Sequence, residues 1–302
     1  MRTWLVRVSL TIVAIAILVP AAFAGWIWLA SEAHLRSFPI PPDFATPIPT
    51  GKDAIARGEH LAITRGCTSC HGRHLEGGVF MEGDWGFRAV AANIALLAKQ
   101  ESPAALERAI RHGIGHDGRA LFSMPSYNFI RMKDADVADL IAFMRAEPAS
   151  EHALPANTLG WKYRWDIVRG ADDAIPAFIP KVPPLTFQSN PDPAVRRGEY
   201  LAMTSCNECH GFGLRGDDLW SEADHKPPDL AIVGSYEKAD FVRLMRTGKA
   251  AGNRELVLMS GVARYRFAHW TDREVDDLYA FLRAMSAKAI AAQTGQRTTS
   301  GR

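Results

Sequence analysis

The sequence is short of cysteine and has almost no excess charge. Its 302 residues contain four cysteines, all within residues 66–72 and 205–211, so none remains for a long-range disulfide framework. The 35 basic and 33 acidic residues nearly cancel, which gives no electrostatic reason to expect a nucleic-acid partner. No general acid–base pair or activated nucleophile stands out, so no side chain is predicted to be catalytic.

Ionisable side chains are absent from residues 8–30. A helix of this length rises roughly 35 Å, enough to cross the hydrocarbon core of a bilayer. Arg2 and Arg7 precede the run, and basic flanking residues stay in the cytoplasm, so the rest of the chain is expected in the periplasm. We expect residues 1–36 to be a single-pass anchor in the inner membrane. The alternative is a signal peptide cleaved after the small-residue site at 22–24.

Proline is concentrated in two segments that separate the other parts of the chain. Residues 37–52 contain five prolines and are expected to form a semi-rigid stalk. Residues 148–192 are too many for an ordinary loop and carry "WKYRW" at 161–165, so we expect them to lie ordered across one or both neighbouring domains. Residues 289–302 are expected to form a flexible tail.

The two cysteine-bearing stretches belong to a longer internal repeat. "RGEHLAITRGCTSCHG" (57–72) matches "RGEYLAMTSCNECHG" (197–211) with one deletion. "FIRMKDADVADLIAFMRA" (129–146) matches "FAHWTDREVDDLYAFLRA" (267–284) without a gap. Both copies therefore have the same order of elements: a short helix, the cysteine motif, a variable loop, a second helix and a final helix. An internal duplication explains this pattern.

The spacing of apolar residues predicts helices rather than strands. One stripe recurs at i, i+3, i+4 and i+7 in the final helix of the first copy: Val137, Leu140, Ile141 and Met144. Thr271 and Glu274 form a predicted capping box, and Ser102 precedes a proline at a predicted first helical position. No segment alternates convincingly enough for a sheet. The predicted fold is all-α, with tandem domains at 53–147 and 193–288 behind the N-terminal transmembrane helix.

The motifs "GCTSCHG" and "SCNECHG" share the pattern C-x-x-C-H. A redox-active cysteine pair or a disulfide has no need of the following histidine, and a structural zinc site needs four ligands. C-x-x-C-H is instead typical of covalently attached c-type haem, with two thioether bonds and a proximal imidazole. We therefore predict two haem c groups. The predicted attachment residues are Cys67, Cys70 and His71 in the first copy and Cys206, Cys209 and His210 in the second.

A methionine is expected to complete the coordination of each iron. Met124 lies before a proline in "HDGRALFSMPSYNF", on a loop ahead of the final helix, and is the predicted distal ligand of the first haem. Weaker candidates in this copy are Met81, Met132 and Met144. In the second copy, the gapless alignment of the final helices sets Val262 opposite Met124. Met259 lies three residues earlier and is the predicted ligand, with an open or histidine-ligated iron as the alternative.

The segment "HDGRALFSMPSYNF…DADVADLIAFMRA" resembles class I cytochrome c domains, especially those in the cytochrome subunits of membrane-bound alcohol and gluconate dehydrogenases. "LMSGVARYRF…TDREVDDLYAFLRA" resembles another variant of that domain. The resemblance implies a three-helix haem fold whose first and last helices cross, with Gly58 and Gly198 permitting the close approach. The chain departs from those dehydrogenase subunits in having two haem sites where they carry three.

These observations predict a membrane-tethered dihaem electron carrier rather than an enzyme. Its expected donor is a dehydrogenase or quinol-oxidising complex, its acceptor could be a terminal oxidase, and it could serve as the cytochrome subunit of an oxidoreductase complex. The alternative is a dihaem redox enzyme, a peroxidase or thiosulfate-type dehydrogenase, in which the second haem is open or unusually ligated.

Overall fold

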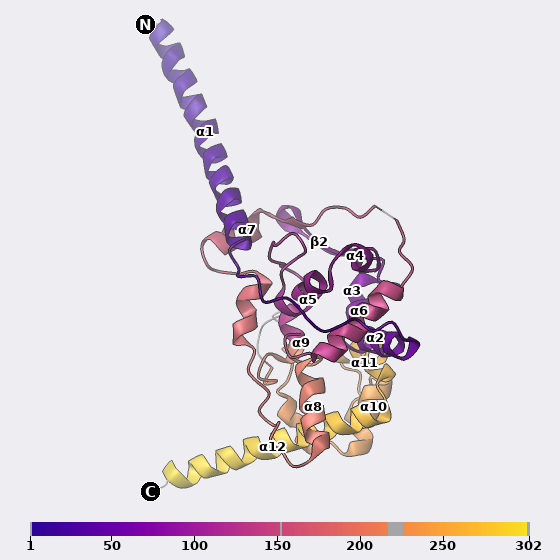
Figure 1. Ribbon diagram of the computed structural model, residues 1–302. Helices are drawn as coiled ribbons and strands as arrows, with labels where there is room; N and C mark the ends of the chain where they lie inside the picture. The colour runs from indigo at the N-terminus through magenta and orange to yellow at the C-terminus, as the bar shows by residue number, and fades with distance from the viewer. Residues whose placement is uncertain (1, 152, 217–225, 301–302) are drawn as a thin grey trace.

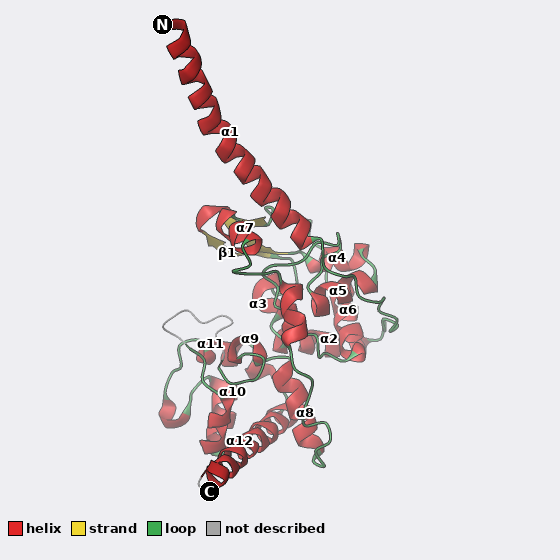
Figure 2. Ribbon diagram, turned by 90° about the vertical axis from the view of Figure 1, so that its left-hand side faces the viewer, coloured by secondary structure: helices red, strands yellow, loops and turns green. Residues whose placement is uncertain are grey.

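The computed structural model describes residues 2–151, 153–216 and 226–300. A long helix, α1 (Arg2–Leu35), projects away from a helical body (Figure 1). Within that body, the first bundle (residues 52–146) lies between α1 and the second bundle (residues 193–300), and short strands flank the first bundle (Figure 2).

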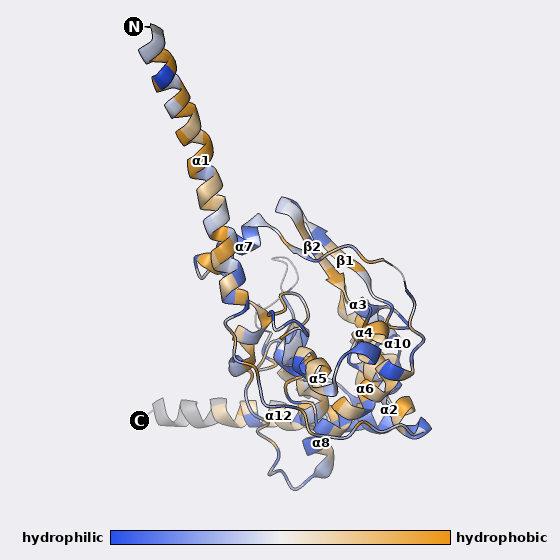
Figure 3. Ribbon diagram, turned by 45° about the horizontal axis from the view of Figure 1, so that its top comes forward, coloured by the Kyte–Doolittle hydropathy of each residue, from blue (hydrophilic) through white to orange (hydrophobic). Residues whose placement is uncertain are grey.

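The projecting helix is apolar over most of its length. In the described part of the chain, α1 is the one helix long and apolar enough to cross a membrane. Most of its side chains are exposed, and much of its ribbon has the colour of hydrophobic residues, whereas the ribbon of the body is mixed in colour (Figure 3). The C-terminal end of α1 differs, because Ile27, Ser31 and Leu35 are buried where the helix meets the body of the molecule.

The first bundle is organised around two crossing helices. Its helical elements are α2 (Lys52–Thr64), α3 (Cys67–His71), α4 (Ile94–Gln100), α5 (Pro103–His112), η2 (Ser126–Asn128) and α6 (Asp134–Ala146). α2 packs across α6 at Gly58, where any Cβ would overlap the carbonyl oxygen of Asp139. Beside this crossing, Arg57 forms a bidentate ion pair with Asp139. The predicted cap is confirmed, since Ser102 accepts a hydrogen bond from the amide of Ala105.

The second bundle repeats the crossing. Its helical elements are α8 (Pro193–Met203), α9 (Asn207–His210), η4 (Leu230–Ser235), α10 (Lys238–Thr247), η5 (Ala251–Asn253), α11 (Met259–Tyr265), η6 (Phe267–His269) and α12 (Asp272–Ser300). α8 packs across α12 at Gly198, where a Cβ would overlap the carbonyl oxygen of Asp277, and Arg197 pairs with Asp277. The predicted capping box is also confirmed: Thr271 and Glu274 exchange hydrogen bonds.

A small antiparallel sheet corrects the expectation that the halves contain no strands. β1 (Gly78–Gly83) and β2 (Phe87–Ala91) form a hairpin around η1 (Asp84–Gly86), and β3 (Thr158–Leu159) joins the free edge of β2. The pairing register shifts between Val79 and Met81, within a run of three consecutive apolar residues. Such a bulge breaks the strict period of two by which strands are recognised in a sequence.

The proline-rich segments lie against the body. Residues 148–192 are ordered as expected among those described, and include β3, α7 (Trp161–Val168) and η3 (Ile175–Lys181). The guanidinium of Arg131 donates to the carbonyl oxygens of Val182 and Pro183, which fixes the path beyond η3. In the N-terminal segment, Phe44 and Ile48 pack on the first core, so this segment follows the bundle rather than standing free as a stalk.

Residues 289–300 also differ from expectation, because they continue α12 instead of forming a flexible tail. The segment "SAKAIAAQ" (286–293) is rich in alanine and contains no proline, so its backbone has a high helix propensity and no local stop signal.

Candidate functional site

The first cysteine motif sits on a short helix held between two glycines. Gly66 precedes α3 with a φ of 83°, and Gly72 follows it with a φ of 82°. These are left-handed conformations that an L side chain rarely adopts. Beyond Gly72 the chain folds back, and the amide of Gly77 donates to the carbonyl oxygen of His71 at 2.7 Å. The turn buries Leu75 completely and fixes the position of the histidine.

The second motif repeats this local structure. Gly211 follows α9 with a φ of 76°, and the amide of Gly216 donates to the carbonyl oxygen of His210 at 2.9 Å. Leu214 is buried, as Leu75 is in the first copy, and both have a φ of 59°. Two separate sequences thus fold into the same helix and return turn around a histidine.

Both motif histidines have the tautomer required of a metal ligand. Nδ1 of His71 lies 2.8 Å from the carbonyl oxygen of Ala92, and Nδ1 of His210 lies 2.8 Å from that of Pro228. A carbonyl only accepts, so each Nδ1 carries the hydrogen and each Nε2 presents a lone pair. Burial lowers the pKa of both imidazoles, which favours the neutral form that binds metals.

The four cysteines do not have the environment of reactive thiols. No disulfide joins them. Burial raises the pKa of Cys67 to about 11, that of Cys206 to about 12 and that of Cys209 to about 11, and it also raises the pKa of Cys70. Redox-active C-x-x-C pairs instead have lowered thiol pKa values. The surroundings therefore argue against a thiol–disulfide function and are compatible with cysteines whose sulfur is covalently capped.

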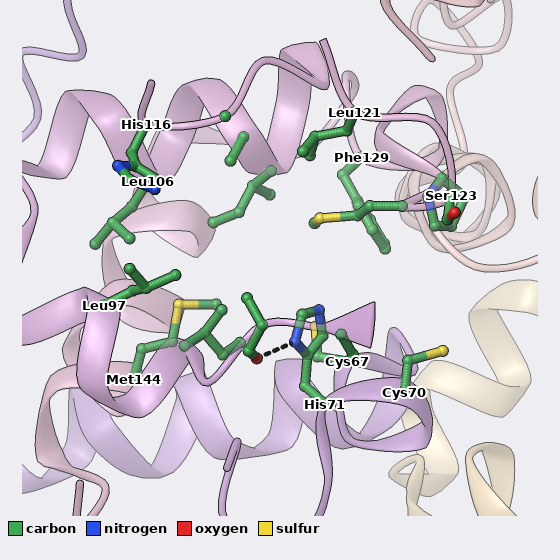
Figure 4. A pocket seen from close by; sticks show the side chains of 18 of the residues that line it. Cys67, Cys70, His71, Leu97, Leu106, His116, Leu121, Ser123, Phe129 and Met144 are labelled. Carbon is green, nitrogen blue, oxygen red and sulfur yellow. Dashed lines mark hydrogen bonds between the residues drawn. The ribbon is translucent and has the colours of Figure 1, made fainter. Parts of the chain in front are cut away.

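A cavity of about 410 Å³ opens directly onto the first motif. Its lining includes Cys67, Cys70 and His71 on one wall, with side chains of the 121–129 segment opposite (Figure 4). Apolar side chains form most of the lining, and the volume lies in the range of pockets that enclose organic cofactors. One polar group interrupts this apolar lining. The buried hydroxyl of Ser123, on the wall opposite His71, has no hydrogen-bond partner among the described residues, so it is available to a polar group in the cavity.

Three methionines line this cavity, and their positions differ. Met144 lies on the same wall as His71 and therefore cannot reach the opposite face of a planar group between the walls (Figure 4). Met124 is half-buried and follows Ser123, which lies on the wall opposite His71. Met132 is almost fully buried in the core, and Met81 is exposed and outside the lining. Met124 is therefore the one of the three that adjoins the wall opposite His71, and its role as a ligand stays a prediction.

A cavity of about 340 Å³ lies near the second motif and is lined by Phe212 and Leu214, but not by His210 or Met259. Met259 is half-buried at the start of α11 and packs against the second core, as Val262 does.

A spacing missed in the sequence relates Met259 to Met124. Gly113 caps the C-terminus of α5 and Gly248 caps that of α10, both with left-handed φ, and each glycine is followed by an isolated antiparallel bridge. Met124 lies 11 positions after the first glycine (124 − 113) and Met259 lies 11 after the second (259 − 248). An alignment that starts from the preceding helix therefore pairs the two methionines without a gap. The three extra residues of the second copy then lie between its methionine and its final helix.

The two bundles meet around their motifs through Arg65, a residue that sequence reasoning passed over. The guanidinium of Arg65 donates to Thr204 Oγ1 at 3.1 Å and lies 5.8 Å from the ring centre of Trp270. Only 3% of Arg65 is exposed. The first copy has two residues here, Arg65 and Gly66, where the second copy has Ser205 alone. This one-residue difference between the repeats was the only sequence feature that marked Arg65.

Arg266 connects the motifs themselves. Its Nε donates to Ser69 Oγ at 3.1 Å, and its other guanidinium nitrogen lies 2.9 Å from Glu208 Oε2. Ser69 and Glu208 are the residues that immediately precede the second cysteine of each motif. Glu208 also lines the first cavity, so the second motif approaches the first site directly.

Comparison with known proteins gives a family for the first bundle. Residues 55–147 match the family model for cytochrome c. The match covers both walls of the cavity, including the C-x-x-C-H motif and Met124.

Curated relatives match larger parts of the chain. The chain is 27% identical to the cytochrome c subunit of a quinone alcohol dehydrogenase from Gluconobacter oxydans, over 80% of its own length and 57% of the relative's. It is 28% identical to a diheme c-type cytochrome from Cereibacter sphaeroides, over 61% of its length and 67% of the relative's. It is also 28% identical to one subunit of a nicotinate dehydrogenase from Pseudomonas putida, over 52% of its length and 14% of the relative's. The chain thus spans little more than half of the first relative.

Proposed function

Because residues 55–147 form a cytochrome c domain, in a chain related to the cytochrome subunits of quinone alcohol dehydrogenases, we propose that the protein is a membrane-tethered electron carrier with two haem c groups. The observation that carries the proposal is the repeated geometry of the two motifs, in which each histidine has Nδ1 fixed on a carbonyl oxygen and Nε2 free. The dihaem relative supports the same count.

Each residue has a defined role in this proposal. Cys67 and Cys70 would hold the first haem by thioether bonds, and His71 and Met124, which both line the cavity, would supply the ligands of its iron. In the second bundle, Cys206 and Cys209 would hold the haem, and His210 and Met259 would supply the ligands of its iron. Haem c with histidine and methionine ligands supplies one-electron transfer at a relatively high potential. The apolar walls exclude water, while the Nδ1 hydrogen bonds keep both imidazoles in one orientation.

The location and partners follow from the anchor and the relatives. We propose that α1 spans the inner membrane once, with both bundles in the periplasm, because Arg7 precedes the apolar run and C-x-x-C-H attachment belongs to exported proteins. Two relatives are parts of dehydrogenases, so a membrane dehydrogenase is the favoured donor, with a quinol-oxidising complex as another source of electrons.

The haem count is tested on the purified, detergent-solubilised chain. The intact mass should exceed that of the polypeptide by two haems, and acid–acetone extraction should release neither. The double variant Cys67→Ala/Cys70→Ala should retain one haem, as should Cys206→Ala/Cys209→Ala, because the motifs lie on different bundles. One haem in the wild type, or haem lost on extraction, would contradict the proposal. Intact mass spectrometry and pyridine haemochrome spectra give independent counts.

A further inference from the structure

Beside the first bundle, the hairpin and α7 expose a group of large apolar side chains, of which only Phe80 also lines the first cavity. We call it the apolar face. Its members on the hairpin are Val79, Phe80, Met81 and Trp85, and those on α7 are Trp161 and Trp165. Trp85 is 70% exposed and Trp161 is 47% exposed. A cluster of this kind on a folded protein marks a contact surface.

The hairpin and α7 form one continuous surface. β3 pairs with β2 at Phe87 and Leu159, and α7 begins two residues later at Trp161. The ring of Phe87 stacks on that of Tyr163 at 5.4 Å, and α7 also contacts η1 at the tip of the hairpin. The two sets of exposed side chains therefore keep a fixed relation to each other.

Contacts with α1 fix the position of this surface along the axis of that helix. Arg164 donates to Ser31 Oγ at 2.7 Å and pairs with Glu32 at 2.8 Å, and both partners lie at the end of α1. The ring of Trp165 lies 5.7 Å from that of Phe23, further along the same helix. α7 is therefore held alongside the last turns of the charge-free run, and the hairpin lies on the same side of the body (Figures 1 and 2).

This level coincides with the end of the apolar run of α1. Tryptophan gathers at the boundary between hydrocarbon and water, where an apolar ring with one polar N–H is best accommodated. Trp26 and Trp28 occupy that level on α1, and the exposed tryptophans of α7 stand beside them. A soluble partner protein would provide no reason for the alignment with α1, whereas a bilayer crossed by α1 accounts for it.

We propose that the apolar face lies in the interfacial layer of the bilayer, so that the first bundle rests on the membrane surface. The inference depends on the proposed anchoring by α1. It also deepens the proposed function, because Phe80 belongs both to the apolar face and to the lining of the first cavity. The first haem site then opens close to the lipid, within reach of a donor that stays in the membrane.

The test uses the full haem-loaded chain in nanodiscs that contain a phospholipid with a photoactivatable diazirine near its glycerol backbone. After irradiation, peptide mass spectrometry should find lipid adducts in residues 79–85 and 161–165 as well as in α1. Val257 and Leu258 provide the internal control, since they are 75% and 67% exposed but belong to the second bundle. They should carry no adducts.

A matched pair of variants sharpens the result. Trp85→Ser/Trp161→Ser should reduce adducts on the apolar face severalfold while those on α1 persist, and Val257→Ser/Leu258→Ser should change neither. Adducts confined to α1 would overturn the inference and point to a protein partner on this face, while leaving the anchor intact. Adducts on neither α1 nor the face would refute both the anchor and the inference. Equal labelling at 257–258 would also overturn it, because the face would then have no preference for lipid.

Discussion

At the scale of single residues, the ligand of the second iron distinguishes a carrier from an enzyme. Met259 has the same spacing from its helix-ending glycine as Met124, although it begins a helix instead of lying in a loop. A closed second iron would favour electron transfer, and an open one would favour chemistry on a small molecule.

We expect Met259→Ala to open the second iron. The variant should gain a high-spin signal, bind carbon monoxide at one haem and show a lower potential for that haem, because loss of a thioether ligand disfavours the ferrous state. Val262→Ala is the control, since Val262 is the residue that the final-helix alignment sets opposite Met124. Optical redox titration and carbon monoxide difference spectra measure the change. If the wild type already binds carbon monoxide at one haem and Met259→Ala alters nothing, the assignment is wrong and the dihaem enzyme becomes the better hypothesis.

Residues with a fixed chemical pattern were predictable from the sequence. The attachment motifs were recognised by their spacing and Met124 by its loop position, and their roles in binding haem stay predictions. The close approach at Gly58 and Gly198, which the resemblance implied, is confirmed. Arg65 and Arg266 were not predictable, since an arginine on a helix or loop is ordinarily solvated. Their roles depend on how one bundle docks on the other, and no local pattern specifies that docking.

At the scale of elements, the two helix crossings depend on the absence of a side chain. At both Gly58 and Gly198 a Cβ would overlap backbone of the partner helix, which cannot move aside as a flexible side chain can.

Gly58→Ala and Gly198→Ala should therefore each destabilise their bundle, by roughly 1–3 kcal/mol or more as for an overpacked core. Gly261→Ala is the control: it lies in α11, a Cβ added there would meet nothing within 4 Å, and the variant should be neutral or slightly stabilising through helix propensity. Denaturant unfolding followed by far-ultraviolet circular dichroism gives the three values. Equal stability of all three variants would show that the crossings tolerate separation.

Elements with a strong helical period were predicted correctly, and those without one were not. The apolar stripe of α6 and the capping box of α12 specify those helices locally. The hairpin escaped prediction because its bulge disrupts alternation and because its third strand comes from residues 158–159, far along the chain. The helical end of α12 was not predicted because chain termini are usually disordered, although the alanines of this segment have a high helix propensity.

At the scale of the whole molecule, one partly buried carboxylate at the bundle interface makes the docking dependent on pH. His60 on α2 lies 2.9 Å from both carboxylate oxygens of Glu274 on α12. Burial alone would raise the pKa of Glu274, but the hydrogen bonds from His60 and Thr271 hold it at about 2. The folded pKa is thus below the unfolded one, so this group stabilises the fold fully above the unfolded value of 4.5 and loses that effect as the pH falls towards 2.

We expect the wild type to lose on the order of 2 kcal/mol of its free energy of unfolding from this group over that acid window. Glu274→Gln should be less stable than the wild type near neutral pH, and the difference should shrink as the pH falls towards 2. Glu59→Gln removes an exposed carboxylate next to His60 in the sequence and should follow the wild type. Unfolding curves across the acid range measure all three. A constant difference between wild type and Glu274→Gln would contradict the account.

The contact of Arg266 with both motifs bears on how the two copies diverged after duplication. Ser69 and Glu208 occupy the same position in the two repeats, yet one guanidinium contacts both, taking a hydroxyl on one side and a carboxylate on the other. The two positions can no longer carry the same residue at no cost: a serine at 208 would leave the Arg266 cation without its counter-charge, and a glutamate at 69 would set two carboxylates on one guanidinium. The halves began as interchangeable copies and have become complementary parts that must evolve together.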